Sequence, residues 1–351
     1  MYSRQMLNEI GDRQKGFESA SGLVRLIPGL PFIIRLDGRA FKSFTRRANK
    51  PFDRDLSDIM DETTAALVQE FNADVGYTQS DEISLGFKND DPYGVMPMNG
   101  RRDKLLSLVA GYASAAFMKN LLNSPFAKRA SNKIPSFDAR VSQLPTLELA
   151  GEHFRWREMD SVMNSINALA SSVFQESKLH GLNADDRLEL LAFNEVSWMD
   201  LGTRNQRGAY YQRCRLNREL TPSEREKIPE KHRPAVGTQV FRSVVLDLEL
   251  PACDDILNYE EVLFYGAEPR LKSDVLLELT EALGVGTAPI TAPAEKPTAP
   301  TPLPQGLPVI GSVEEYQTML SQRVVPAPTP YVAPVFEEVQ DSWASSLNLH
   351  T

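Results

Sequence analysis

The sequence has few of the residues that build disulfide frameworks and zinc sites. Its two cysteines, Cys214 and Cys253, are too few for a disulfide network or a cysteine-based zinc cluster. Its four histidines show no zinc-ligand spacing. No apolar run approaches the roughly 20 residues that cross a bilayer, and the first residues lack the apolar core of a secretory signal. We therefore expect a soluble, cytoplasmic protein with no membrane partner.

Positive charge is also in deficit, because 38 Lys and Arg residues stand against 47 Asp and Glu residues. The formal net charge of −9 argues against a protein that coats nucleic acid non-specifically. Two stretches depart from this average. Residues 101–133 contain seven Lys or Arg residues and one acid, and residues 203–218 contain five Arg residues and no acid. On charge alone, each stretch is explained equally well as a phosphate-binding surface or as an ordinary solvated surface.

The chain of 351 residues is long enough for two average domains or one elaborated domain, and 42% of its residues are hydrophobic. The folded body is expected to span residues 1–286. Proline then dominates, since 11 of the 24 prolines lie between Pro289 and Pro334. Proline removes an amide donor and fixes φ. Residues 287–351 are therefore predicted to form a disordered, Pro-rich linker that carries a short C-terminal element.

The body shows the periodicities of both strands and helices. Compact or alternating apolar residues indicate strands, and apolar residues three or four apart indicate helices. In chain order they predict a strand ending at Asp37-Gly38, a helix over 56–71, a hairpin over 75–87 with its tip at 80–82, a helix over 103–122, a strand over 136–145 and a long helix over 158–174. This order matches the split βαβ, ferredoxin-like arrangement. We predict an α+β fold, an antiparallel sheet with helices packed on one face.

Acidic residues mark two of the predicted strand ends. Asp37 ends the first strand, and Asp81 and Glu82 lie at the tip of the hairpin. In a split βαβ sheet the first strand can lie beside this hairpin, so the three carboxylates can meet. Such a cluster suits Mg²⁺, which takes oxygen ligands, and Gly38 would offer its carbonyl without side-chain obstruction. The alternative is structural, since Asp-Gly and Ser-Asp-Glu are also common turn sequences.

Basic residues near these acids favour a site for nucleotide phosphates. They surround the first acid or follow the second in the sequence: Arg35, Arg39, Lys42, Lys50, Arg101, Arg102 and Lys104. The chain has no GxxxxGK[ST] loop, so a P-loop NTPase is not supported. Two ions held about 4 Å apart can clamp the attacking and leaving oxygens of a phosphoryl transfer, the chemistry that this pattern favours.

Several motifs then follow one another in a recognisable order. They are IIRLDGRAFKSFT, KPFDRDLSDIMDETTAALVQEF, VGYTQSDEISLGF, RRDKLLSLVAGYASAAF, PSFDARVSQLP, FRWREMDSVMNSINALASSVF and, more loosely, LELLAFNEVSWMDL with QRGAYY. Together they resemble the tRNA-His guanylyltransferase superfamily, including the related reverse-direction tRNA repair polymerases. The resemblance covers residues 31–211 and implies a domain similar to the palm of ordinary polymerases.

The resemblance also implies roles for individual residues. Asp37 and Asp81 would be catalytic ligands of two Mg²⁺ ions, with the Gly38 carbonyl as a further ligand, and Glu82 would support the same centre. The nucleotide site would be lined by Asp37, Gly38, Arg39, Ala40, Phe41, Lys42, Ser80 and Asp81. Triphosphates or the RNA end would be held by Arg35, Lys50, Arg101, Arg102 and Lys104, and nucleotide or RNA by Asn164.

The implied reaction adds a nucleotide, usually G, to the 5′ end of a tRNA, with GTP and ATP as substrates and a homotetramer as the usual assembly. Residues 161–165, Ser-Val-Met-Asn-Ser, stand where guanylyltransferases proper have Cys-His-Ile-Asn-Asn. This departure favours the repair-type relatives over strict tRNA-His specificity. Two other functions stay open: a palm-like cyclic-nucleotide or dinucleotide synthase, and a catalytically silent RNA-binding protein.

Overall fold

The computed structural model describes residues 12–15, 24–91, 95–283 and 309–310. Its strands are β1 (Phe32–Gly38), β2 (Val75–Gln79), β3 (Glu82–Phe87), β4 (Phe137–Gln143), β5 (Ala209–Glu219), β6 (Gln239–Leu248) and β7 (Val309–Ile310). Its longer helices are α3 (Arg54–Phe71), α4 (Arg102–Asn123), α5 (Leu147–Val173), α7 (Ala184–Phe193) and α11 (Lys272–Leu283). Short helices are α2 (Phe41–Phe44), α6 (Glu176–Leu179), α8 (Thr203–Arg207), α9 (Pro222–Glu226) and α10 (Tyr259–Tyr265). Apart from β7, the predicted Pro-rich linker and C-terminal element lie outside the described residues.

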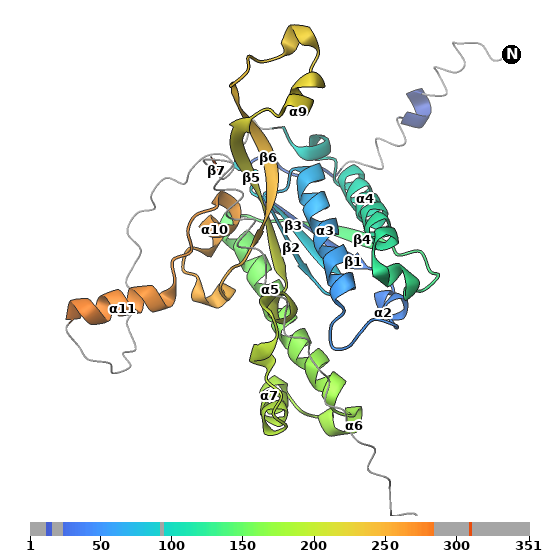
Figure 1. Ribbon diagram of the computed structural model, residues 1–351, viewed down its shortest axis with the longest axis vertical. Helices are drawn as coiled ribbons and strands as arrows, with labels where there is room; N and C mark the ends of the chain where they lie inside the picture. Colours follow the sequence, from blue (N-terminus) through green and yellow to red (C-terminus); the bar gives the residue numbers. More distant parts are fainter. Residues whose placement is uncertain (1–11, 16–23, 92–94, 284–308, 311–351) are drawn as a thin grey trace, which may run out of the picture.

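The strands form one sheet in the order β4-β1-β3-β2-β5-β6, and the short β7 pairs with β5. The pairs along this path are antiparallel, whereas β7 runs parallel to β5. The order of the first four strands is the one that a β-α-β-β-α-β unit requires, so the prediction of a mixed α+β fold with an antiparallel sheet is confirmed. The β5–β6 hairpin projects from the body with α9 near its tip (Figure 1).

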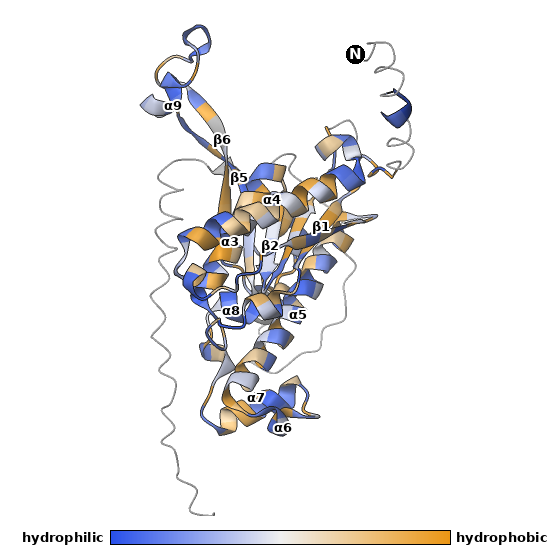
Figure 2. Ribbon diagram, turned by 90° about the vertical axis from the view of Figure 1, so that its right-hand side faces the viewer, coloured by the Kyte–Doolittle hydropathy of each residue, from blue (hydrophilic) through white to orange (hydrophobic). Residues whose placement is uncertain are grey.

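The two faces of the sheet are both covered by helices. Because side chains alternate along a strand, Ile34 and Leu36 point to one core, which they share with α3 and α4. Their neighbour Ile33 belongs to a second core, where it packs with Phe154 of α5 and Leu263 of α10. The prediction of helices on one face is right for α3 and α4, but α5 and α10 cover the opposite face. Figure 2 shows α3 and α5 on either side of the central strands.

The helix α3 has clear physical limits. Asp53 caps its first turn by accepting a hydrogen bond from the Leu56 amide, and Asn72 ends it in the left-handed conformation at φ 56°. Between them, Ile59, Leu67 and other apolar residues three or four apart are buried. The helix predicted over 56–71 is therefore present and begins two residues earlier.

The helix α4 is, by length and composition, apolar enough to cross a membrane, the one such helix in the described part of the chain. Its buried residues recur every four positions, at Leu105, Val109, Ala113, Phe117 and Leu121. The Phe117 ring contacts the rings of Phe41 and Phe137 at 5.2 and 5.6 Å between centroids. This apolar stripe is thus part of the protein core.

The helix α5 begins at Leu147, 11 residues before the predicted start at Glu158. The Thr146 hydroxyl accepts a hydrogen bond from the Leu149 amide and caps the first turn. The extra turns bring Ala150 and Phe154, both fully buried, onto the second face of the sheet. The predicted start was therefore wrong, and the Pro145-Thr146 pair was the sequence signal that could have located the true one.

We expect Thr146→Ala to lower the free energy of unfolding by about 0.5–2 kcal/mol, because the first turn of α5 loses its side-chain cap. Thr146→Ser retains the hydroxyl and serves as the matched control, with little expected change. Urea unfolding followed by circular dichroism measures both variants. Equal stability of Thr146→Ala and wild type would show that α5 does not begin at this residue.

Candidate active site

The end of β1 meets the turn between β2 and β3. The Gly38 amide donates a hydrogen bond to the Asp81 carbonyl at 3.0 Å. Across the sheet, Asp37 lies directly opposite Glu82 of β3 and Asp138 of β4. The sheet register therefore brings together the two acidic positions that are distant in the sequence, as the split βαβ order predicts.

Asp37 and Asp81 repel each other at this junction. Burial raises the pKa of the Asp81 carboxyl, the hydrogen bond from the Ser80 hydroxyl lowers it, and the negative charge of Asp37 raises it further. The Ser80 Oγ–Asp81 Oδ1 distance is 3.1 Å. A bound cation would relieve this repulsion, and two carboxylates beside a backbone carbonyl are donors of the kind that Mg²⁺ prefers. In the residues described here, no group of three or more His, Cys, Asp or Glu side chains is placed to hold a metal.

Glu82 has a different environment from the two aspartates. Its Oε1 accepts a hydrogen bond from Arg157 Nε at 2.5 Å, and its Oε2 lies 4.0 Å from Arg35 Nε. Burial raises the pKa of Glu82, while Arg157 opposes the rise. The carboxylate is thus held between two guanidinium groups, and Arg157 fixes its orientation. This geometry makes Glu82 a neighbour of the acidic pair rather than a third member of it.

Arg157 extends this contact into α5. Its second guanidinium nitrogen donates to Asp160 Oδ2 at 2.8 Å, and the same oxygen accepts from Asn164 Nδ2 at 3.0 Å. Gln79, at the end of β2, approaches that oxygen to 3.5 Å. The predicted residue Asn164 is therefore oriented by Asp160 at the same end of the sheet as Asp81.

Gly38 is required by packing as well as by the strand end. A Cβ atom at this position would lie 2.4 Å from the Phe41 ring, which is too close for any side chain. Phe41 is only 3% exposed and belongs to an aromatic cluster with Phe44 and Phe117. Ala40, which lies between Gly38 and Phe41 in the sequence, is exposed and has φ 58°, so the chain turns sharply there. The segment from Asp37 to Phe41 is consequently anchored in the core by Phe41, while Arg39 and Ala40 are exposed to solvent.

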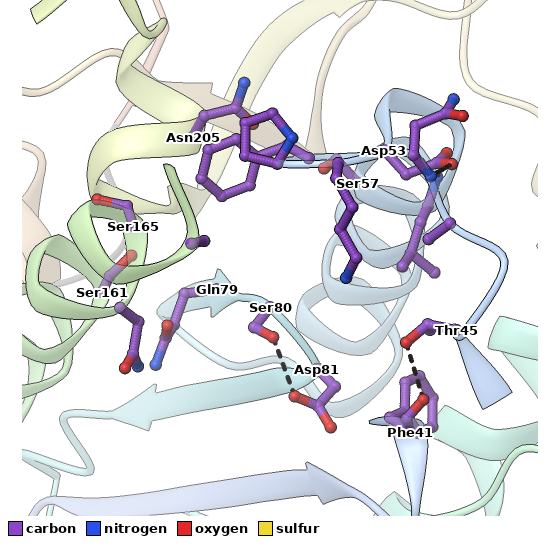
Figure 3. A pocket seen from close by; sticks show the side chains of 18 of the residues that line it. Phe41, Thr45, Asp53, Ser57, Gln79, Ser80, Asp81, Ser161, Ser165 and Asn205 are labelled. Carbon is purple, nitrogen blue, oxygen red and sulfur yellow. Dashed lines mark hydrogen bonds between the residues drawn. The ribbon is translucent and has the colours of Figure 1, made fainter. Parts of the chain in front are cut away.

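A cavity of about 370 Å³ opens beside Asp81. Figure 3 shows Ser80 and Asp81 on one side, Asp53 and Ser57 at the start of α3 on another, and Ser161 and Ser165 of α5 across from them. The predicted residues among its lining are Phe41, Lys42, Lys50, Ser80, Asp81 and Asn164. Two exposed lysines thus share the lining with hydroxyl and amide groups and with the charged Asp53, Asp81 and Arg204, a chemistry suited to a nucleotide's phosphates and base.

Arg204 and Asn205 of α8 also line this cavity, and sequence reasoning did not single them out for it. The Arg204 Nε lies 2.8 and 3.1 Å from the two carboxylate oxygens of Asp61 in α3. This ion pair ties α8 to α3 and fixes Asn205 at the cavity wall. The only signal in the sequence was the arginine-rich stretch itself.

Most of that stretch serves internal ion pairs. Arg207 lies 3.5 Å from Glu158, and Arg213 lies 3.6 Å from Asp74. Arg218 pairs with Glu224 at 2.7 Å. Neither a phosphate-binding surface nor a plain solvated surface describes these arginines, because their partners are acids elsewhere in the fold.

Three other predicted basic residues are not near the carboxylates. Arg101, Arg102 and Lys104 are exposed at the N-terminal end of α4. β3 carries the chain away from Asp81, so α4 begins at the far end of the sheet and returns towards Asp37 (Figure 1). Within one chain these residues do not reach the acidic pair, whereas Arg35 lies 4.0 Å from Glu82 and Lys50 lines the cavity that Asp81 also lines. Arg39 is exposed, and its amide bonds the Ser136 carbonyl at 2.9 Å.

The chain is similar to proteins of one family in sequence and in fold. The family sequence model for tRNAHis guanylyltransferase matches residues 11–145. A probable tRNA(His) guanylyltransferase of Drosophila melanogaster is 26% identical over 65% of this chain and 81% of the relative. A solved bacterial tRNA(His) guanylyltransferase (Thg1)-like protein in complex with ATP has 31% identity and a TM-score of 0.53, covering 58% of this chain and 86% of that one. A second bacterial structure of this kind, in complex with GTP, has 27% identity and a TM-score of 0.53, covering 70% and 94%.

Burial of the Asp81 carboxylate, together with repulsion from Asp37, predicts a gain of stability when its charge is removed. A carboxyl whose pKa is raised by folding destabilises the folded state at pH values above that pKa. In buffer without divalent cations, Asp81→Asn should therefore melt at a higher temperature than wild type. Millimolar Mg²⁺ should raise the melting temperature of wild type and leave the variant unchanged.

Asp185→Asn, which removes an exposed acid on α7, is the matched control and should respond to Mg²⁺ as wild type does. Calorimetry at neutral pH measures all three proteins. A lower melting temperature for Asp81→Asn without cation would contradict the repulsion between the two aspartates.

The partly buried side chain of His153 predicts that the free energy of unfolding depends on pH. Burial lowers its pKa to about 4, and the nearby charges of Arg35 and Arg157 act in the same direction. Between its ordinary pKa of about 6.5 and this value, the unfolded chain binds a proton that the folded chain does not, so stability rises with pH across this window.

His153→Gln should flatten that dependence by at most about 1.4 kcal/mol per pH unit, the contribution of one proton. Glutamine retains a partner for the Ser84 hydroxyl, which lies 3.2 Å from His153 Nε2. Urea unfolding between pH 4.5 and 7.5 measures the slope. An unchanged slope in the variant would contradict the placement of a neutral imidazole at this position.

Proposed function

Because the chain belongs to the tRNAHis guanylyltransferase (Thg1) family and is a nucleotidyltransferase enzyme, we propose that it adds a nucleotide, typically G, to the 5′ end of a tRNA by 3′-to-5′ chemistry. The observation that carries the proposal is the junction of β1 with the β2–β3 turn, where the end of β1 at Asp37 meets Asp81, which lines a nucleotide-sized cavity. The domain would resemble a polymerase palm, since Asp37 and Asp81 stand at strand ends of an antiparallel sheet with the order β4-β1-β3-β2.

The cavity is the proposed site for a nucleoside triphosphate. The bacterial relatives solved with ATP and with GTP support nucleotides as its substrates. Lys42 and Lys50 would offset phosphate charge at its mouth, and Asn164 and Asn205 would offer amides to the base. Lysine suits this task because its ammonium group is a compact charge with three donors.

Asp37, Asp81 and the Gly38 carbonyl would hold two Mg²⁺ ions, which when bound would offset charge on the reacting phosphates and lower the pKa of the attacking hydroxyl. Burial and the charge of Asp37 disfavour the ionised form of Asp81, and a bound cation would favour it. Glu82 would act indirectly, by fixing Arg157 and through it Asp160 and Asn164. We assign Glu82 a positioning role.

The bond changes follow from the substrates. The 3′ hydroxyl oxygen of the incoming nucleotide would attack the 5′ phosphorus of the RNA, which is activated as an adenylate or carries a triphosphate. A new P–O bond forms as the bond to AMP or pyrophosphate breaks, and the hydroxyl proton leaves to solvent or a phosphate oxygen. The chain's part is to align the two substrates across the carboxylates.

General 5′-end repair fits this chain better than strict tRNA-His specificity. Val162 stands where guanylyltransferases proper have a histidine, and its neighbours Ser161 and Ser165 present hydroxyls to the cavity. A valine at that position provides no proton donor or acceptor for a defined base. Assembly as a homotetramer and a cytoplasmic location complete the proposal by family resemblance.

A labelled-tRNA extension assay with GTP, ATP and Mg²⁺ tests this function on a panel of intact and 5′-truncated tRNAs. We expect extension by wild type, most strongly on truncated tRNAs, and a loss of about 10²-fold or more in Asp37→Asn and Asp81→Asn. Asp185→Asn changes an exposed residue outside the cavity lining and should extend as wild type does.

Extension that persists unchanged in both active-site variants would refute the assignment of Asp37 and Asp81. New products formed from nucleoside triphosphates alone, without RNA, would identify a cyclic-nucleotide or dinucleotide synthase instead. Retention of RNA with no extension of any substrate would identify a catalytically silent RNA-binding protein.

A further inference from the structure

The acidic pair has a second flank that the cavity does not include. Trp156 of α5 is 51% exposed there, although it is one of the largest apolar side chains in the chain. Its indole lies 4.4 Å from the Arg157 guanidinium carbon and 5.4 Å from that of Arg35, measured to the ring centroid. The His153 ring meets it edge-on at 5.7 Å.

These contacts give the indole a fixed orientation. Arg157 is itself held by Glu82 and Asp160, and His153 by the Ser84 hydroxyl. An exposed aromatic side chain that is already ordered loses little conformational entropy on binding. Half of its surface is nevertheless open to solvent, so core packing does not account for its position.

The surroundings of Trp156 are open on the side of β4. Arg35 and Asp37 lie on the same face of β1, because they are two residues apart, and Arg140 of β4 stands directly opposite Arg35. Within the described residues β4 is an edge strand of the sheet. Arg140 and Asp138 are both more than half exposed and pair at 3.0 Å. This face can therefore admit a macromolecule alongside the acidic pair.

The opposite flank of α5 differs in character. Ser161, Asn164 and Ser165 line the cavity of about 370 Å³, which has room for a nucleotide and not for an RNA helix. Trp156 and Arg35 are absent from that lining. A reaction that joins a nucleotide to an RNA must bring two substrates to the same carboxylates. The nucleotide fits the enclosed cavity, whereas the RNA needs an open surface.

We propose that Trp156 is a stacking platform for a nucleobase of the RNA substrate, at or next to its reacting end. The inference rests on the proposed function, because it is the RNA that requires the open approach. Aromatic side chains and arginine guanidinium planes are the groups on which unpaired RNA bases stack. Trp156 presents the aromatic surface and the partly exposed Arg35 a guanidinium group, whereas Arg157 is only 6% exposed and serves to order the indole.

A fluorescence experiment tests the contact without relying on catalysis. Trp198→Phe with Trp343→Phe leaves Trp156 as the only tryptophan of the three in the chain. Stacking of a base on the indole should quench this emission when tRNA is added, and GTP alone should leave it unchanged. Retention of tRNA on a filter with no quenching would overturn the proposal, as would quenching by GTP alone.

Steady-state kinetics provides the second test. Trp156→Ala should raise the KM for tRNA about 5- to 150-fold, the range for loss of one stacked base, with kcat and the KM for GTP unchanged. Trp156→Phe keeps an aromatic face and should recover most of this loss. Met159→Ala, which truncates a neighbouring α5 side chain that is 53% exposed, is the matched control and should behave as wild type.

The remaining outcomes also decide the question. A rise in the KM for GTP alone would assign the indole to the incoming nucleotide and overturn the proposal. A change in oligomeric mass on light scattering, with an unchanged KM for tRNA, would make this face a contact between copies of the chain and also overturn it. If wild type extends no RNA, the proposed function fails, while quenching by tRNA still decides the stacking site. An active enzyme without quenching removes only the stacking site.

Discussion

The hydrogen bond between the Gly38 amide and the Asp81 carbonyl holds the end of β1 against the β2–β3 turn, and the candidate site is built around it. Because the backbone fixes this junction, the carboxylates of Asp37 and Asp81 stay close although their charges repel. The hydrophobic cores on the two faces of the sheet supply the free energy that offsets this repulsion, and β1 contributes side chains to both cores. A site of this kind is poised for a cation, since binding removes a repulsion that folding has imposed.

Ion pairs organise the layer around this junction. The chain is acidic overall, yet its arginines recur as internal partners of acids that are distant in sequence, such as Arg204 with Asp61 in α3. Arg129 joins Asp53 and Asp55 at the start of the same helix. Partly buried pairs of this type gain little net stability, but breaking one leaves a charge without a partner. The value of these two pairs is orientation, because Arg204 and Asp53 both line the cavity.

The parts that sequence predicted well are those governed by local periodicity. The apolar spacing of α3 and the alternation in β2 and β3 are direct consequences of burying one face, so the strands and the acidic turn followed from them. The start of α5 was missed because its first turns depend on the Thr146 cap. Arg101 and its neighbours were expected near Asp81 because they follow it in the sequence, but an intervening strand carries the chain to the other end of the sheet. The position of Arg204 at the cavity could not be predicted for a similar reason, since its partner Asp61 lies 143 positions away in the sequence.

The pairing of β7 with β5 has a consequence for contacts between molecules. β2 bonds to the first residues of β5, Ala209–Gln212, while β6 occupies the other side along the whole strand. Val309 and Ile310 pair with Arg215 and Leu216, the stretch that β2 leaves uncovered. Uncovered strand edges recruit strands from neighbouring chains. Val309 and Ile310 therefore protect this edge of β5 against pairing with a neighbouring chain. Their loss would lower the solubility of the protein before it lowered the catalytic rate.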